Sequence, residues 1–200
     1  VMRTADSLQQ TGVNIGSNSA TPPRDIVITG VSFTSLEPID LVLIDRAEGV
    51  SISNCNFKGS LASAPSNASD DIAGVRFDST AANTCKQIEI NNCKFSYMSY
   101  AVNTDENIQG VTIQNSQFNT IYQGILLGTG TPDNGGPEGV RIVQNLFDEI
   151  AKQAIEIGAV AFNVSAYNIF LDCGNDYLGA GNAASPIIEF NGDNNVSVGD

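Results

Sequence analysis

The sequence predicts an all-β protein, a single-stranded parallel β-helix or solenoid, and three observations support this prediction. A short apolar motif that ends in phenylalanine recurs six times along the chain. A second apolar pair accompanies the copies of this motif, and turn-forming Asn, Gly, Ser and Asp separate the segments. Within each segment, apolar residues alternate with polar ones, which is typical of short strands with one buried face.

The first predicted strand of each repeat is the segment that leads up to phenylalanine. Its phenylalanines are Phe33, Phe57, Phe95, Phe118, Phe147 and Phe170. The gaps between them are 24, 38, 23, 29 and 23 residues, so the base period is about 23 residues. The two long gaps predict loop insertions near 59–73 and 129–137. We therefore expect about seven rungs of roughly 23 residues each.

The second predicted strand of each rung is a pair of inward residues around one outward residue. The pairs are Val13/Ile15, Val42/Ile44, Val75/Phe77, Val102/Thr104, Ile125/Leu127, Ile155/Ile157 and Ile188/Phe190. A single rung cannot bury its own inner face, but rungs stacked about 4.8 Å apart can. A β-sandwich also has many short strands, but it does not require its repeats to match in register.

Polar and sulfur-containing residues recur at fixed places in the turns. Asn54, Asn92 and Asn115 each precede a phenylalanine by three residues, so their side-chain amides are expected to stack and hydrogen-bond between rungs. Cys55 and Cys93 share the next position. Two small buried thiols are the favoured interpretation, and a disulfide between rungs is the alternative.

The repeat covers most of the chain, so residues 1–200 are predicted to form one domain. Residues 1–10 lack the pattern and form a poorly defined lead-in. The repeat is incomplete at both ends, and no capping helix is evident, although solenoids need their terminal faces covered. We therefore expect this chain to be part of a longer protein.

The repeated unit V-x-I-x-N-C-x-F, with its period near 23, resembles the right-handed parallel β-helix superfamily over roughly residues 11–200. That superfamily includes pectate lyases, polygalacturonases, pectin methylesterases, epimerases and phage tailspikes. The resemblance implies the right-handed fold and suggests a site on an outer sheet face beside long loops. It does not imply one activity, because this fold carries many functions.

The charge of the chain excludes some classes of partner. The net charge is −13, from 9 basic and 22 acidic residues, and histidine is absent. Nucleic acid and anionic membranes both require cationic surfaces, so neither is an expected partner. No run of about 18 apolar residues occurs, so no membrane insertion is expected. The cysteine spacing lacks a zinc motif. We expect no cofactor or metal, with calcium as the one alternative.

The candidate catalytic residues are Asp45, Asp78 and Asp105, which directly follow three successive inward pairs. Stacked carboxylates about 5 Å apart raise one pKa or attract a cation. Such spacing also falls in the range of glycosidase carboxylate pairs. Turn formation through hydrogen bonds to local backbone N–H groups is the favoured role, and calcium binding and glycoside chemistry stay open. The polygalacturonase pattern includes a histidine, which this chain lacks.

The candidate glycan-binding residues lie on the outward side of the second strand and next to it. They are Arg76, Asn103, Glu156, Glu189, Tyr100 and Tyr122. Tyrosine rings can stack on sugars, although they can equally pack at the border of the core. Outward Val27, Leu43 and Leu126 would need cover, and packing three solenoids side by side would provide it.

Together these features favour a structural segment of a viral tail spike or fibre that contacts host-surface glycans. Its expected partners are two further copies in a homotrimer, a host cell-surface polysaccharide and neighbouring virion proteins. The expected location is the virion tail or an extracellular surface. The alternatives are a polysaccharide hydrolase or lyase and a bacterial surface adhesin, and the residues favour a protein that is not an enzyme.

Overall fold

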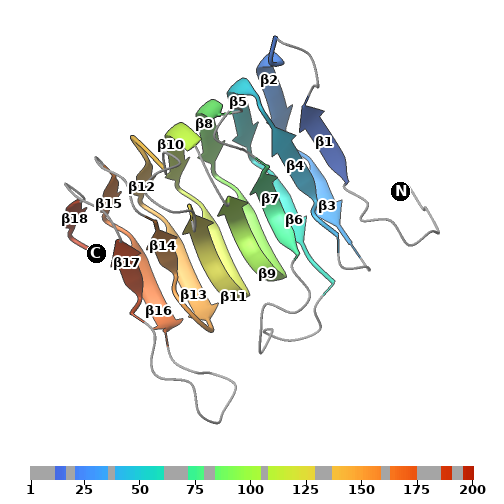
Figure 1. The fold of residues 1–200 in the computed structure, drawn as a ribbon. Helices are drawn as coiled ribbons and strands as arrows, with labels where there is room; N and C mark the ends of the chain where they lie inside the picture. Colours follow the sequence, from blue (N-terminus) through green and yellow to red (C-terminus); the bar gives the residue numbers. More distant parts are fainter. Residues whose placement is uncertain are drawn as a thin grey trace.

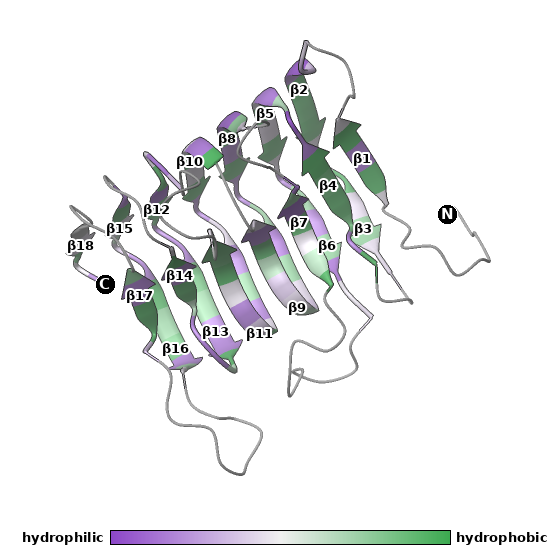
Figure 2. Cartoon of the chain, viewed as in Figure 1, coloured by the Kyte–Doolittle hydropathy of each residue, from purple (hydrophilic) through white to green (hydrophobic). Residues whose placement is uncertain are grey.

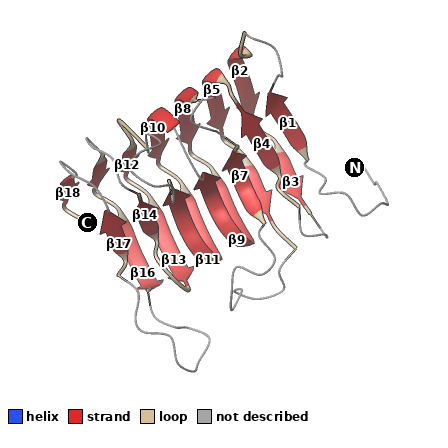
Figure 3. Ribbon diagram, in the orientation of Figure 1, coloured by secondary structure: helices blue, strands red, loops and turns tan. Residues whose placement is uncertain are grey.

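The computed structural model of the chain is a parallel β-solenoid of about five turns, with about 27 residues per turn (Figure 1). The structure describes residues 12–16, 21–35, 39–60, 72–78, 84–104, 108–128, 137–158, 163–174, 186–190 and 196–200. These residues form strands and connecting turns, and no helix occurs among them (Figure 3). The average turn exceeds the 23-residue base period because the gaps of 38 and 29 residues are included.

Eighteen strands are described, and the order of their labels follows the chain. They are β1 (Val13–Gly16), β2 (Arg24–Thr29), β3 (Ser32–Thr34), β4 (Val42–Asp45), β5 (Glu48–Ser53), β6 (Asn56–Lys58), β7 (Ala73–Phe77), β8 (Cys85–Asn91), β9 (Lys94–Thr104), β10 (Ile108–Gln114), β11 (Gln117–Leu127), β12 (Arg141–Val143), β13 (Leu146–Ile150), β14 (Ile155–Ile157), β15 (Val164–Ala166), β16 (Ile169–Cys173), β17 (Ile188–Phe190) and β18 (Val196–Val198). All their pairings are parallel, as stacking of like rungs requires.

The strands form three stacked columns. One is a seven-stranded sheet in the order β18-β15-β12-β10-β8-β5-β2. The other two columns belong to one 11-stranded sheet, which bends at the boundary between them. The phenylalanine strands β3, β6, β13 and β16 form one part of this sheet, and β1, β4, β7, β14 and β17 form the other. The long strands β9 and β11 run through both parts.

Residues with positive φ recur at three corners of the rungs. One corner precedes phenylalanine by three residues and holds Gly30, Asn54, Asn92, Asn115, Gln144 and Tyr167. The second follows phenylalanine by two residues and holds Tyr97, Thr120, Glu149 and Asp172. The third lies near the beginning of the strands of the seven-stranded sheet and holds Asp25, Gly49, Gln87, Gly110 and Gly139. Asparagine and glycine suit these corners because they tolerate left-handed backbone geometry better than other residues.

The predicted phenylalanine ladder forms the centre of the core. Six rings stack in sequence order, with centroid separations from 4.6 to 5.1 Å and interplanar angles of 13° or less. The second-strand pairs lie in register beside them, as Val42↔Val75↔Val102 illustrates. In Figure 2 the strands β4 and β14 of this column are largely hydrophobic. The parallel solenoid and its register are therefore confirmed.

The asparagine column is confirmed in part. Asn92 Nδ2 donates to Asn54 Oδ1 at 2.7 Å, as predicted for stacked turn amides. At the next rung, Asn115 Nδ2 donates instead to Asn91 Oδ1, at 3.2 Å. The amide ladder thus continues, but it shifts by one residue.

A second polar column, which lies inside the solenoid, occupies the position two residues before each phenylalanine. From Cys55 onward its members are Cys55, Cys93, Ser116, Asn145 and Asn168, and Asp200 extends it. Each backbone N–H from Cys93 onward donates to the side chain of the following rung: Cys93 to Ser116 Oγ (3.1 Å), Ser116 to Asn145 Oδ1 (2.9 Å), Asn145 to Asn168 Oδ1 (2.9 Å) and Asn168 to Asp200 Oδ1 (2.7 Å). We call this set the inner ladder. It satisfies backbone donors at a corner where strand pairing is interrupted.

All four cysteines are buried free thiols, so the disulfide alternative for Cys55 and Cys93 is wrong. Burial raises the pKa of Cys93 to about 11, because a thiolate loses its hydration there. The thiolate is the reactive form. We therefore expect all four thiols of the native protein to resist iodoacetamide at pH 8 and to react fully in urea. Mass spectrometry of the labelled chain measures this, and native labelling as fast as that in urea would contradict it.

Candidate functional site

The outer face of the second-strand column carries a row of mostly polar residues. Each member of this row is the lateral neighbour of the next. In order along the stack, the members are Leu43, Arg76, Asn103, Leu126, Glu156 and Glu189. We call this the outer row. It contains four of the predicted glycan-binding residues, and the sequence pattern predicted its order. The register places Arg76 beside Asn103 and Glu156 beside Glu189, while Leu126 separates the two pairs.

A repeated diagonal contact supports the outer row. At three rungs, the residue two positions before the inward pair reaches the outward residue of the following rung. Asp40 Oδ2 accepts from Arg76 Nε at 2.7 Å, Gln123 Nε2 donates to Glu156 Oε2 at 2.6 Å, and Gln153 Nε2 donates to Glu189 Oε2 at 2.8 Å. The same geometry at three rungs gives each charged side chain of the row a fixed partner.

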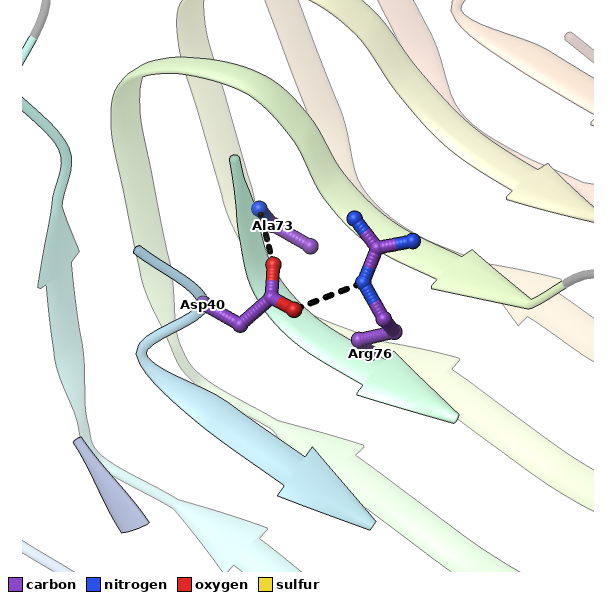
Figure 4. Close-up of polar contacts among 3 residues, drawn as sticks. All are labelled: Asp40, Ala73 and Arg76. Atoms are coloured by element: carbon purple, nitrogen blue, oxygen red, sulfur yellow. Dashed lines mark hydrogen bonds and ion pairs between the residues drawn. The ribbon is translucent and has the colours of Figure 1, made fainter. Parts of the chain in front are cut away.

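Asp40 has two partners, which Figure 4 shows from one side of β7. Its Oδ1 accepts the backbone N–H of Ala73 at 2.9 Å, while its Oδ2 accepts from Arg76. Both side chains of this ion pair are 16% exposed. A partly buried guanidinium–carboxylate pair holds both groups more firmly than a fully exposed pair would. Arg76 is therefore held in a fixed position.

Among the described residues, two oxygens near this face lack a hydrogen-bond donor, although their side chains are almost completely buried. They are Oδ1 of Asn103, a residue that is 3% exposed, and Oε1 of Gln153, a residue that is 6% exposed. A buried acceptor without a donor costs about 1–3 kcal/mol. Such atoms are suited to accept a hydrogen bond from an enclosed water molecule.

The two predicted tyrosines lie at the bend where β9 and β11 pass from one part of the sheet to the other. Tyr100 and Tyr122 make an edge-to-face contact, with ring centroids 6.5 Å apart. Both residues are half-buried. An aromatic pair with one accessible side is suited to stacking against the apolar face of a sugar.

The predicted aspartate column is only partly described. Asp78 N donates to the carbonyl of Ile44, which places Asp78 beside Asp45 on adjacent rungs. Burial and, to a lesser extent, the negative charge of Asp78 raise the pKa of Asp45, while Arg46 opposes that shift. Asp105 lies outside the described residues. The neighbouring pair is therefore present, whereas the catalytic role and the third member stay predictions.

The described residues contain no group of three or more Cys, Asp or Glu arranged to hold a metal ion. None of the described segments forms a helix with the length and apolar character needed to cross a membrane. No family model, curated protein or solved structure matches the chain. Function therefore has to be inferred from the geometry of the chain itself.

Sequence reasoning missed the residues that position the outer row, which are Asp40, Gln123 and Gln153. Their common offset of two residues before each inward pair is visible in the sequence, but their partners become evident only once the rungs are stacked. Leu126 is only 8% exposed within the chain, so it needs no external cover. Val27, in contrast, is 68% exposed.

The raised pKa of the Asp45 carboxyl leads us to expect a small pH dependence of stability. Since its pKa in the folded chain is raised, the protonated form is favoured, and ionisation as pH rises through that pKa lowers stability. Asp45→Asn is therefore expected to raise the free energy of unfolding at pH 7 by roughly 0.5 kcal/mol or less, after allowance for solvent screening. The gain should vanish at pH 3, below the ordinary pKa. Urea midpoints at both pH values measure this, and an equal gain at both would contradict it.

Proposed function

We propose that this chain is a glycan-contacting segment of an elongated viral tail spike or fibre, and that three copies pack side by side. The observation that carries the proposal is the outer row, with its fixed charged groups and the tyrosine pair beside it. Sugars offer hydroxyl donors together with apolar ring faces, and this surface has a partner for each. A rigid stack of rungs suits a long appendage because each rung contacts only its neighbours.

The exposed apolar residues favour association with other copies. Val27 lies on the outside of the seven-stranded sheet, while Ile169 and Leu171 lie on the outside of the phenylalanine strands. A trimer would cover such residues. Sedimentation equilibrium at micromolar concentration is expected to give three times the 21.0 kDa chain mass. A purely monomeric mass would refute the trimer, and it would leave the glycan proposal to be tested separately.

Glycan binding can be tested with an array of bacterial capsular and lipopolysaccharide glycans, followed by calorimetry on any glycan that binds. Tyr122→Ala is expected to weaken binding about fivefold to tenfold, because a lost ring contact is worth about 1–1.5 kcal/mol. Glu189→Gln is expected to weaken it less. Tyr167→Ala is the matched control, since Tyr167 is 64% exposed but lies away from the outer row. Equal losses for Tyr122→Ala and Tyr167→Ala, or no binding to any glycan, would refute this proposal.

A polysaccharide hydrolase is the second candidate, and the Asp45–Asp78 pair is the observation that favours it. Two neighbouring carboxyls, one of which has a raised pKa, resemble the division between acid and nucleophile in glycosidases. If this function is correct, Asp45→Asn and Asp78→Asn should each abolish release of reducing ends from the bound glycan. Neither substitution should weaken glycan binding at the outer row. Unchanged hydrolysis in both variants would eliminate this pair as the catalytic site.

A further inference from the structure

Basic side chains are scarce in this protein, yet three of them surround one surface depression. The chain has 9 lysines and arginines against 22 acidic residues. Arg24, Arg46 and Lys86 line a depression of about 260 Å³, together with Glu48, Pro22 and Thr84. We call this the basic corner. The described residues of its lining include three cations and one carboxylate, a net charge of +2 on a protein whose net charge is −13.

The stacking of the solenoid holds these side chains together. Arg24, Glu48 and Lys86 are lateral neighbours in β2, β5 and β8, at the start of the seven-stranded sheet. Arg46 lies in the connection between β4 and β5, so it reaches the same corner from the adjoining column. The arrangement therefore depends on strand register and not on a long loop.

Internal pairing leaves positive charge available at this corner. Glu48 Oε2 accepts from Arg24 at 2.9 Å, and this partly exposed ion pair uses the one carboxylate among the described residues of the lining. Arg46 lies close enough to Asp45 to offset part of the increase in the pKa of that carboxyl, so part of its charge is already used within the chain. The exposed side chain of Lys86 has no ion-pair or hydrogen-bond partner in the described part of the chain.

We propose that the basic corner binds an oxyanion, such as the sulfate or carboxylate group of an acidic saccharide. Guanidinium groups match the planar geometry of carboxylates and the oxygens of sulfates, a lysine adds a point charge, and the Thr84 hydroxyl can donate a hydrogen bond. The depression accommodates one charged substituent and not a whole polymer. This site is separate from the outer row, and the proposal holds whether or not the outer row binds glycans.

Titration of the ¹⁵N-labelled protein with sodium sulfate, sodium glucuronate and neutral glucose, at constant ionic strength, tests the proposal. Amide signals of Arg24, Glu48 and Lys86 are expected to shift with one or both anions and not with glucose. A response to sulfate alone identifies a sulfate ester as the source, and a response to glucuronate alone identifies a uronic acid.

Three variants distinguish a built site from general attraction of anions. Lys86→Gln is expected to weaken binding about threefold to fivefold, within the range for an exposed charge contact. Glu48→Gln is expected to strengthen binding, because it removes the competing carboxylate. Lys94→Gln is the matched control, since it removes an exposed lysine from another sheet. Absence of shifts at the corner, or equal losses for Lys86→Gln and Lys94→Gln, would overturn the proposal.

Discussion

Replacing Phe118 with alanine is expected to destabilise the protein by about 3–5 kcal/mol, the usual cost of removing a fully buried ring. Phe118 stacks on Phe95 at 5.1 Å and on Phe147 at 4.6 Å, so the substitution opens a cavity between two rings that the rigid strands hold in place. Urea unfolding followed by circular dichroism measures the change.

Phe33→Ala is the matched control for this prediction. Phe33 has one stacking neighbour, Phe57, and is only partly buried, so its loss is expected to cost about half as much. Phe118→Leu should restore most of the stability because it refills much of the volume. Equal effects of Phe118→Ala and Phe33→Ala would show that the stack does not act as a continuous core.

Replacing Asn145 with leucine is the second substitution expected to have a large effect, at about 3–5 kcal/mol. Asn145 accepts the N–H of Ser116 through Oδ1, and its Nδ2 donates to the carbonyl of Ile113 at 3.0 Å. Leucine has a similar volume but leaves both buried backbone groups without partners, at about 1–3 kcal/mol each. The same unfolding measurement applies.

Asn145→Ser provides the control, because serine occupies the equivalent position in the preceding rung. Ser116 Oγ accepts the N–H of Cys93 and donates to the carbonyl of Gln114 at 2.9 Å. We therefore expect Asn145→Ser to be less destabilising than Asn145→Leu, although it removes more volume. The opposite ranking would mean that packing, and not hydrogen bonding, is the role of this residue.

The fold was predictable because the repeat preserves residue type at the core positions. Phenylalanine recurs at one core position, and aliphatic pairs recur at another, so periodicity alone predicted the register. The inner ladder escaped prediction for the opposite reason. Its residues change from Cys93 to Ser116 to Asn145, and their shared role lies in accepting one backbone N–H, which no similarity of side chains reveals.

The candidate site was predictable only in its outward residues. Alternation along a strand separates outward Arg76 and Asn103 from their inward neighbours. The diagonal partner of Arg76 is Asp40, which is 36 residues away in the sequence. This partner can be identified only when the position of each rung relative to the next one is known. The basic corner was missed for the same reason, because Arg24, Arg46 and Lys86 are dispersed through the sequence.

The inner ladder gives the solenoid a direction. In its backbone-to-side-chain bonds, each N–H donor belongs to the earlier rung and each side-chain acceptor to the later one, from Cys93 to Asp200. A nascent chain that has folded as far as one rung therefore presents an unpaired N–H, which the following rung satisfies as it is added. Each added rung therefore completes a hydrogen bond that the rung before it cannot make for itself.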